Sequence, residues 1–336
     1  MFIVSSYSLA ILLCVITMIC WGSWANTQKL AAKSWRYELF YWDYVIGMVA
    51  FAALMGFTLG SIGDEGRSFT TDLAQITGAG ILSAFIGGVI FNASNILLSA
   101  SISIAGLAVA FPVGVGLALV LGVFINYFGS PKGDAMLLFT GVAMITVALI
   151  LNGLASAKKA QKGESEKSNM KGIMLAVVAG VLMSLFYRFV AASMDLDNFV
   201  NPAVGKATPY SAFFIFSIGV LVSNFVFNTL LMRHPVEGEP VKYRQFFSGS
   251  WRSHSVGVLG GVIWGVGTLF SYIAAGKAGA AISYALGQGA PMIAALWGVF
   301  IWKEFKGCNR MVTTLLSMMF LLFLTGLAFI VMAGGN

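Results

Sequence analysis

Ten long apolar stretches, separated by short polar breaks, dominate the pattern of the chain. An apolar helix of about 20 residues crosses the hydrocarbon core of a bilayer, which is roughly 30 Å thick. The alternation typical of barrel strands is absent, and an open strand in lipid would leave backbone groups unpaired. The pattern therefore predicts an all-α integral membrane protein with ten transmembrane helices, at residues 6–31, 39–61, 75–99, 104–127, 134–154, 172–193, 209–232, 254–275, 279–302 and 311–333.

The composition agrees with this class of protein. Of the 336 residues, 58% are hydrophobic and only 10% are charged, whereas a soluble domain carries about a quarter charged residues. The first apolar run, Tyr7 to Trp24, lacks a basic region before it and a cleavage site after it, which favours a permanent span over a signal peptide. Cys14, Cys20 and Cys308 show neither a pairing pattern nor metal-ligand spacing.

A polar linker divides the ten spans into two sets of five. Residues 156–171 are rich in lysine and poor in apolar side chains, and we expect a flexible, solvated cytoplasmic connection there. The expected domains are an N-terminal five-helix repeat at 1–155 and a C-terminal five-helix repeat at 172–336.

Internal similarity indicates that the two halves are copies. Gly87-Gly88-Val89-Ile90-Phe91 resembles Gly260-Gly261-Val262-Ile263-Trp264 at an offset of 173, and Ala105-Gly106 matches Ala278-Gly279 at the same offset. An odd number of spans per half inverts the second copy in the membrane. Inverted repeats recur in secondary transporters, which bind the solute near mid-membrane where the halves meet.

Lysine and arginine are unevenly distributed between the two sets of loops. Odd-numbered loops hold 15 of the 20 basic residues and even-numbered loops hold four, while Arg188 lies inside a span. Because basic residues are enriched in cytoplasmic loops, odd loops are expected in the cytoplasm of a bacterial-type inner membrane and both termini outside.

Polar and aromatic side chains inside the first and third spans are candidates for binding a solute. Trp21, Trp24 and Asn26 could stack on and hydrogen-bond a planar polar solute, although an interfacial aromatic belt would show the same pattern. Asn92 and Asn95, three residues apart, share one helix face and could bind the carbonyl and NH groups of a heterocycle or the hydroxyls of a sugar.

The eighth and ninth spans supply matching candidates. Trp264 and Thr268 occupy the repeat-related place, and Tyr284 and Gln288 lie one turn apart in the ninth span. Two prolines, Pro112 in the fourth span and Pro291 in the ninth, are expected to interrupt their helices and act as hinges.

Asp43 is an acid about a turn or more inside the second apolar run. Burial disfavours the charged form of a carboxyl group, so this residue is a candidate to carry a coupling proton. The alternative is a structural acid at the interface, close to Lys29, Lys33 or Arg36. Arg188 is expected to pair with Asp195 or Asp197.

Other classes of function lack their signatures. His234 and His254 lie in a basic loop and are expected to be solvated, and the chain has no P-loop, metal cluster or nucleophile–base set. We therefore expect no enzyme activity, cofactor, metal or nucleic-acid partner; the expected partners are a small solute, protons and lipid, with the oligomeric state left open.

Several segments resemble the ureide permeases, a family of the drug/metabolite transporter superfamily near the glucose/ribose uptake and rhamnose–proton symporter groups. They include Phe40-Tyr41-Trp42-Asp43-Tyr44, Ser68-Phe69-Thr70-Thr71, Tyr210-Ser211-Ala212-Phe213-Phe214 and Gln288-Gly289-Ala290-Pro291. The resemblance implies ten helices and proton-linked uptake of oxo-heterocycles such as allantoin, uracil or xanthine. It places Asp43 at the family's acidic position and Asn95 and Gln288 at polar positions.

The chain also departs from the plant pattern. It reads Ala110-Phe111-Pro112 where those proteins carry an acid, it has no asparagine near Thr268, and its central linker is short. We therefore expect a proton-coupled importer of a ureide, nucleobase or related compound working by alternating access. A monosaccharide or nucleoside symporter and a drug or metabolite exporter are the alternatives.

Overall fold

Ten membrane-spanning helices form one bundle in the computed structural model, which describes residues 1–32, 34–160 and 166–335. The predicted fold class is confirmed. The helices are α1 (Tyr7–Ala31), α2 (Tyr37–Phe57), α3 (Phe69–Gln75), α4 (Gly78–Ala105), α5 (Leu107–Gly129), α6 (Ala135–Ala160), α7 (Glu166–Ser193), α8 (Pro209–Arg233), α9 (Tyr243–Phe247), α10 (Trp251–Ala278), α11 (Ala280–Gly287), α12 (Ala290–Leu296), a π-helical turn η1 (Trp297–Ile301) and α13 (Arg310–Ala333).

Polar caps set where several spans begin. The side chains of Ser6, Thr77, Ser250 and Asn309 accept hydrogen bonds from backbone N–H groups in the first turns of α1, α4, α10 and α13. Such caps satisfy donors that have no partner inside the helix. Each apolar run therefore starts at a residue that the local sequence specifies.

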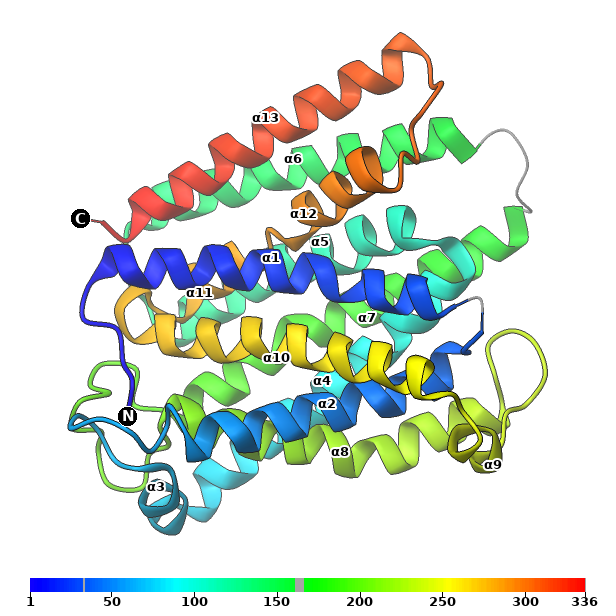
Figure 1. Cartoon of the computed structure of the whole chain (residues 1–336). Coiled ribbons are helices and arrows are strands. Elements are labelled where there is room, and N and C mark those ends of the chain that lie inside the picture. Colours follow the sequence, from blue (N-terminus) through cyan, green and yellow to red (C-terminus); the bar gives the residue numbers. More distant parts are fainter. Residues whose placement is uncertain (33, 161–165, 336) are drawn as a thin grey trace.

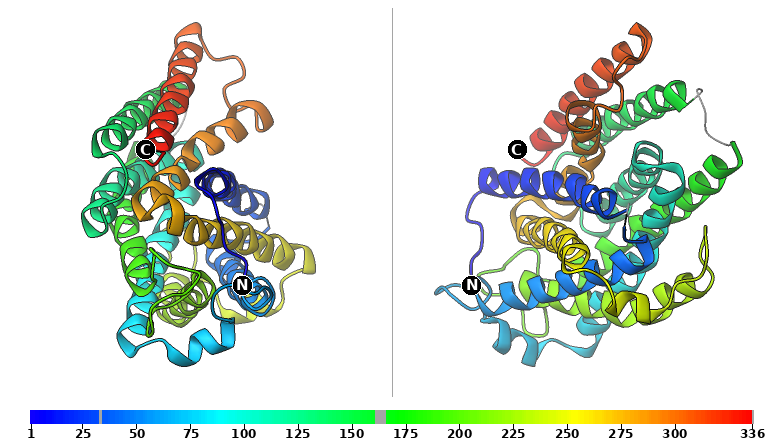
Figure 2. Two further views of the ribbon diagram at one scale, coloured as in Figure 1. Left: turned by 90° about the vertical axis from the view of Figure 1, so that its left-hand side faces the viewer. Right: turned by 45° about the vertical axis from the view of Figure 1, so that its right-hand side comes forward.

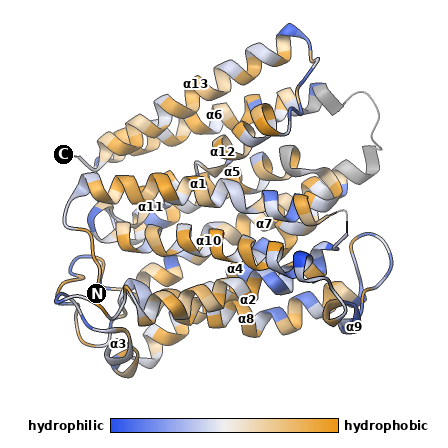
Figure 3. Cartoon of the chain, in the orientation of Figure 1, coloured by the Kyte–Doolittle hydropathy of each residue, from blue (hydrophilic) through white to orange (hydrophobic). Residues whose placement is uncertain are grey.

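The bundle has two distinct ends (Figure 1). The terminal end carries Met1, α3 and the end of α13, and the linker end carries α9 and the end of α6. Figure 2 shows the same long bundle from two further sides. Apolar residues cover the middle of the helices and polar residues gather at both ends (Figure 3). Leu12, Leu54, Phe225 and Leu321 are among the exposed apolar side chains, as expected of surfaces that face lipid.

The helices repeat along the chain with matching lengths. Helices α4 and α10 both have 28 residues and start 173 residues apart, and the short helices α3 and α9 are related by about the same offset. Gly106 and Gly279, which end α4 and α10, have nearly equal backbone angles, φ 79° and ψ 161° against φ 82° and ψ 157°. Related helices run in opposite directions, because α4 begins at the terminal end and α10 at the linker end (Figure 1).

Helices of one half pack mainly against helices of the other half. Helix α4 packs along α7 and α8, and its counterpart α10 packs along α1 and α2, while α6 packs against its counterpart α13. Equivalent hydrogen bonds connect the halves at these contacts. Ser94 Oγ donates to the carbonyl of Ala179, and Thr17 Oγ1 donates to the carbonyl of Gly267, both at 2.7 Å.

Glycines permit the closest helix crossings. A methyl group on Gly261 would overlap the carbonyl oxygen of Tyr44, and one on Gly47 would overlap that of Val258, so α10 and α2 touch backbone to backbone. The repeat-related crossing of α4 and α8 uses Gly88 against Phe216 and Gly219 against Phe85. Small residues allow such contacts in lipid, where no hydrophobic force drives helices together.

Two expectations differ from the observed backbone. Helix α5 continues through Pro112, where the ring removes one backbone hydrogen bond without breaking the helix. Helices α6 and α7 extend into the predicted linker, to Ala160 and from Glu166, because alanine, lysine and glutamate are good helix formers even in water. Residues 161–165 of that linker, including Lys162, and the basic Lys33 of the first loop lie outside the described residues.

The ninth span is broken, as expected from its proline. Helix α11 ends at Gly287 and α12 begins at Ala290, with Gln288 and Gly289 between them and Pro291 in the first turn of α12. The break lies near the middle of the bundle, where an interrupted helix can present side chains and backbone groups to a solute.

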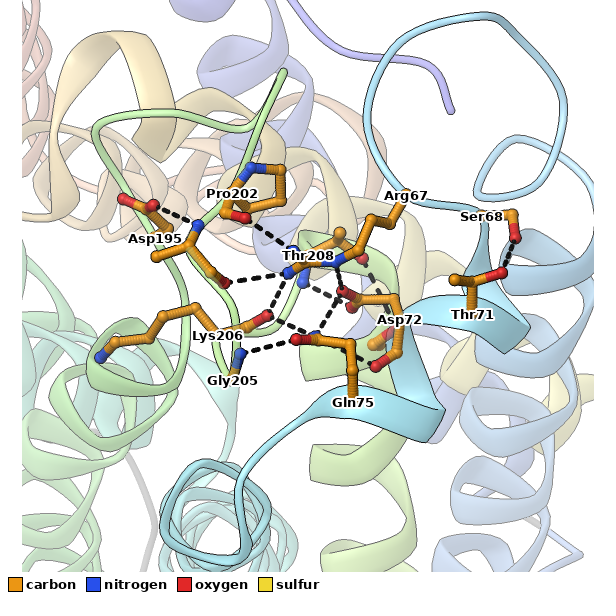
Figure 4. A network of polar contacts seen from close by, with 12 residues as sticks. Arg67, Ser68, Thr71, Asp72, Gln75, Asp195, Pro202, Gly205, Lys206 and Thr208 are labelled. Atoms are coloured by element: carbon orange, nitrogen blue, oxygen red, sulfur yellow. Dashed lines mark hydrogen bonds and ion pairs between the residues drawn. The ribbon is translucent and has the colours of Figure 1, made fainter.

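A polar network closes the terminal end (Figure 4). Arg67 donates to Asp72 at 2.8 Å and to the carbonyls of Pro202 and Lys206 at 2.6 Å each. The other carboxylate oxygen of Asp72 accepts from the backbone N–H of Thr208 at 2.7 Å. These bonds tie α3 to the loop between α7 and α8, and they hold together two loops that are far apart in sequence.

Candidate functional site

A pocket lies near the middle of the bundle. Small-molecule sites are mostly apolar with a few polar groups. The lining comes from α1, α4, α5, α7, α10 and the broken ninth span: Trp21, Trp24, Phe91, Asn95, Leu98, Phe111, Val115, Met183, Phe186, Trp264, Gln288 and Ala290. None of these lining residues is charged, so the pocket suits a neutral solute.

Repeat-related positions of the two halves both contribute to the pocket lining. Phe91 and Trp264 are 173 residues apart, as are Val115 and Gln288. Aligning the last residues of α1 and α7 pairs Trp21 with Met183 and Trp24 with Phe186. The pocket therefore lies where the related helices meet.

Two carboxamides provide the polar groups of the lining, one from each half. Asn95 of α4 is 1% exposed and donates to the hydroxyl of Tyr41 at 3.2 Å, which fixes its orientation. Gln288 stands at the break between α11 and α12. A carboxamide offers both a donor and an acceptor, so each can bind a neighbouring pair of C=O and N–H groups.

Aromatic rings form the walls, and Thr268 orients one of them. The ring centres of Trp21 and Trp264 are 6.0 Å apart, with 11° between the ring planes, and the ring centres of Phe91 and Trp264 are 4.2 Å apart. The hydroxyl of Thr268 accepts from Trp21 Nε1 at 3.0 Å and donates to the carbonyl of Trp264, also at 3.0 Å. Thr268 thus lies behind the aromatic wall and links both tryptophans.

Three other predicted residues are not part of the pocket lining and bind protein groups instead. Asn92 donates to Ser223 of α8 at 2.9 Å, and the hydroxyl of Tyr284 is within 3.2 Å of the carbonyls of Ala118 and Met183. Asn26 accepts a 2.6 Å hydrogen bond from Trp302 toward the linker end. The structure brings Trp21, Trp24, Asn95, Trp264 and Gln288 together around the pocket.

Asp43 lies away from the pocket, where α2 meets α10. Its Oδ1 is 2.7 Å from His254 Nδ1, and its Oδ2 accepts from the indole N–H of Trp35 at 3.0 Å. The Asp43 side chain is 3% exposed and that of His254 is 23% exposed. His254 is therefore a partner of Asp43, not the fully solvated residue that its loop-like sequence predicted.

The Asp43–His254 pair is not duplicated in the other half. When the related helices are aligned by their first residues, Ile215 is equivalent to Asp43 and Ile81 is equivalent to His254. Ile215 is buried and Ile81 is 40% exposed, so the equivalent positions of the other half carry neither an acid nor an imidazole.

Sequence reasoning missed the apolar half of the pocket. Phe111, Met183 and Phe186 have ordinary membrane-helix side chains, and nothing in their own sequence marks them as lining residues. The repeat supplies the missing signal, because Met183 and Phe186 align with Trp21 and Trp24. Arg188 packs against Gly129 of α5, and Asp195 accepts from the backbone N–H of Ala203.

The ten long apolar helices define an integral membrane protein, and the match to a family of permeases makes it a transporter. More narrowly, the chain belongs to the ureide permease family, whose model matches residues 40–171 and 156–334. The resemblance found from the sequence is thereby confirmed.

Individual relatives agree with this family. The chain is 24% identical to ureide permease 1 of Arabidopsis thaliana over all of both proteins, and 25% identical to ureide permease 5 of the same plant over all of this chain and 96% of that one. It is 27% identical to a probable glucose uptake protein, GlcU, of Staphylococcus aureus over 69% of this chain and 71% of that protein. One crystal structure, at 16% identity, shares the fold with a TM-score of 0.59 over 96% of both chains.

Proposed function

We propose that this protein imports a small, neutral, planar solute of the ureide or oxo-heterocycle class, such as a nucleobase. The observation that carries this proposal is the central pocket, in which aromatic walls surround the carboxamides of Asn95 and Gln288. A flat ring can stack on the tryptophans while its C=O and N–H edges pair with the amides. The relatives named ureide permeases support the same class of solute.

A monosaccharide is the second candidate solute. A nucleoside would combine the ring of a nucleobase with the hydroxyls of a sugar. The similarity to a glucose uptake protein favours the sugar, and aromatic rings also stack on sugar faces. The difference is chemical: a sugar presents hydroxyls around its ring, whereas a ureide presents alternating amide groups that match two carboxamides.

The proposed driving force is a proton gradient acting through Asp43 and His254. Both side chains lie at the crossing of α2 and α10, which come from different halves, so a proton there can alter how the halves pack. In alternating access, the halves rock around the pocket while the coupling site gains and loses its proton. We place the protein in a bacterial inner membrane with both termini outside, in keeping with its basic loops.

Uptake into proteoliposomes tests the solute. Radiolabelled allantoin, uracil, xanthine, glucose and ribose are compared with and without an inward proton gradient. We expect accumulation of an oxo-heterocycle that collapses when the gradient is dissipated. Uptake of a sugar alone would transfer the proposal to the second candidate, and efflux against the gradient would indicate an exporter.

Two variants test the coupling pair. Asp43→Asn is expected to abolish gradient-driven accumulation while solute exchange at equal concentrations persists, and His254→Gln is expected to weaken accumulation in the same direction. Because exchange needs the pocket and not the proton, the two assays separate coupling from binding. Accumulation that survives Asp43→Asn would rule out the proton role of this residue.

A further inference from the structure

A second cavity lies beside the central pocket toward the linker end. It is lined by Phe111, Pro112, Asn152, Pro291, Ala294, Ala295, Gly298, Glu304 and Phe305. The side chains come from α5, α6, the broken ninth span and the loop that follows it.

Phe111 is the residue that the two cavities share. On the other wall the lining changes between neighbouring residues, since Ala290 faces the central pocket and Pro291 the second cavity. The two cavities therefore adjoin, and both are in contact with Phe111.

The second cavity contains a buried carboxamide. Asn152 of α6 is only 5% exposed and lines the cavity. A carboxamide in such a place can bind water or the polar groups of a ligand. An amide at a cavity with phenylalanine walls repeats, in simpler form, the chemistry of the central pocket.

Contacts between α1 and the end of the ninth span close this region at the linker end. Lys29 Nζ lies 2.5 Å from Glu304 Oε1 and 4.4 Å from the centre of the Trp302 ring. Trp302 also donates to Asn26, and Trp297 donates to Ser23 at 2.9 Å. Glu304 lines the cavity and takes part in this closure, so the ion pair connects the two.

We propose that the second cavity is a transit site for the transported solute, divided from the central pocket by Phe111 and closed at the linker end by the Lys29–Glu304 pair. The site would take the same small, neutral compound, with Asn152 binding its amide or hydroxyl groups. The inference rests on the proposed transport function, but the layout of the two cavities can be tested without transport.

Two cysteine reporters, one turn apart, distinguish the cavities. In a background with Cys14, Cys20 and Cys308 replaced by serine, Ala294→Cys reports on the second cavity and Ala290→Cys on the central pocket. The purified protein in lipid nanodiscs is treated with a small water-soluble maleimide, and the labelling rates are measured by mass spectrometry.

Glu304→Gln removes the ion pair and is expected to raise the labelling rate of Ala294→Cys about fivefold, in line with the strength of a partly exposed charge pair. The rate for Ala290→Cys should stay unchanged until Phe111→Ala is added. The exchanged pair Lys29→Glu with Glu304→Lys should restore slow labelling, which shows that the effect comes from the charge pair and not from misfolding.

Two outcomes would overturn the layout: no change at Ala294→Cys on removing the ion pair, or equal labelling of both reporters while Phe111 is intact.

The solute is tested separately, with allantoin and uracil added as protectants of Ala294→Cys in the Glu304→Gln protein. Protection that is lost in Asn152→Ala supports the transit site. If the labelling rates are as expected but no transported compound protects Ala294→Cys, the two-cavity layout is supported and solute binding in the second cavity is rejected. If the layout is found but none of the panel is taken up, the proposed function fails and the two-cavity layout stands.

Discussion

Asn92 and Asn95 occupy neighbouring positions on one face of α4, yet the structure separates their roles. Asn92 binds Ser223 between α4 and α8, whereas Asn95 lines the central pocket and is oriented by Tyr41. The spacing of three residues predicted a shared face correctly. It could not predict which of the two side chains the neighbouring helix would cover, because that depends on where α8 crosses.

Replacing these two asparagines gives a matched comparison. Asn95→Ala is expected to raise the KM for uptake about fivefold, since one hydrogen bond to the solute contributes about 1 kcal/mol. Asn92→Ala should lower thermal stability and leave KM near its original value. Equal effects of both variants on KM would show that the pocket extends to Asn92.

Thr268 was expected to bind solute, and in the structure its hydroxyl contacts both tryptophans of the wall. Thr268→Val removes the acceptor for the Trp21 indole N–H and is expected to raise KM several-fold, because an unpaired buried donor costs about 1 to 3 kcal/mol. Thr268→Ser keeps the hydroxyl and should restore both KM and the tryptophan fluorescence change on solute addition. Failure of the serine variant to rescue would mean that the methyl group is what matters.

At the scale of helices, the apolar pattern predicted all ten spans, and a proline correctly predicted the broken ninth one. The same reasoning failed for α5, because a single proline removes one hydrogen bond and does not by itself break a helix held by its neighbours. The sequence also separated Asp43 from His254 by a long stretch, so their contact depended on the packing of α2 against α10. Only the repeated glycine motif hinted that this crossing would be close.

The glycine crossings give a prediction at this scale. Gly261→Ala and Gly88→Ala each force a methyl group into the backbone of the facing helix, so each is expected to destabilise the protein by about 1 to 3 kcal/mol or more. Gly153→Ala is the control, since no atom lies near the added methyl and alanine is the better helix former. Melting temperatures followed by fluorescence-detected size exclusion would measure all three. A Gly261→Ala protein as stable as Gly153→Ala would contradict the backbone contact with Tyr44.

For the whole molecule, even span number and basic loops predict the same side for both chain ends. The first and last spans do start and finish at the terminal end, while α9 lies at the opposite one (Figure 1). Which membrane face each end meets depends on insertion and is not encoded in the packing of the helices. The charge pattern remains the best guide to that choice.

Sidedness can be measured in intact cells. Reporter domains that act only outside the cytoplasm are expected to be active when fused to either terminus, and Ser248→Cys near α9 should react only after the membrane is permeabilised. Ser130→Cys at the terminal end should react in intact cells and serves as the opposite control. Inactive fusions at both termini, with the two cysteine results reversed, would invert the assigned orientation.

The packing of α4 on α7 and of α1 on α10, each between the two halves, has a consequence for synthesis on the ribosome. The first five spans enter the membrane before α7 and α8 exist, so Ser94 and the surface around Gly88 have nothing to bind during that interval. A half-made chain therefore keeps the contacts of α5 with α4 and α6 but lacks the larger contacts that α1 and α4 make with the second half. Final assembly waits for the last spans, since α1 gains its main neighbour only when α10 arrives.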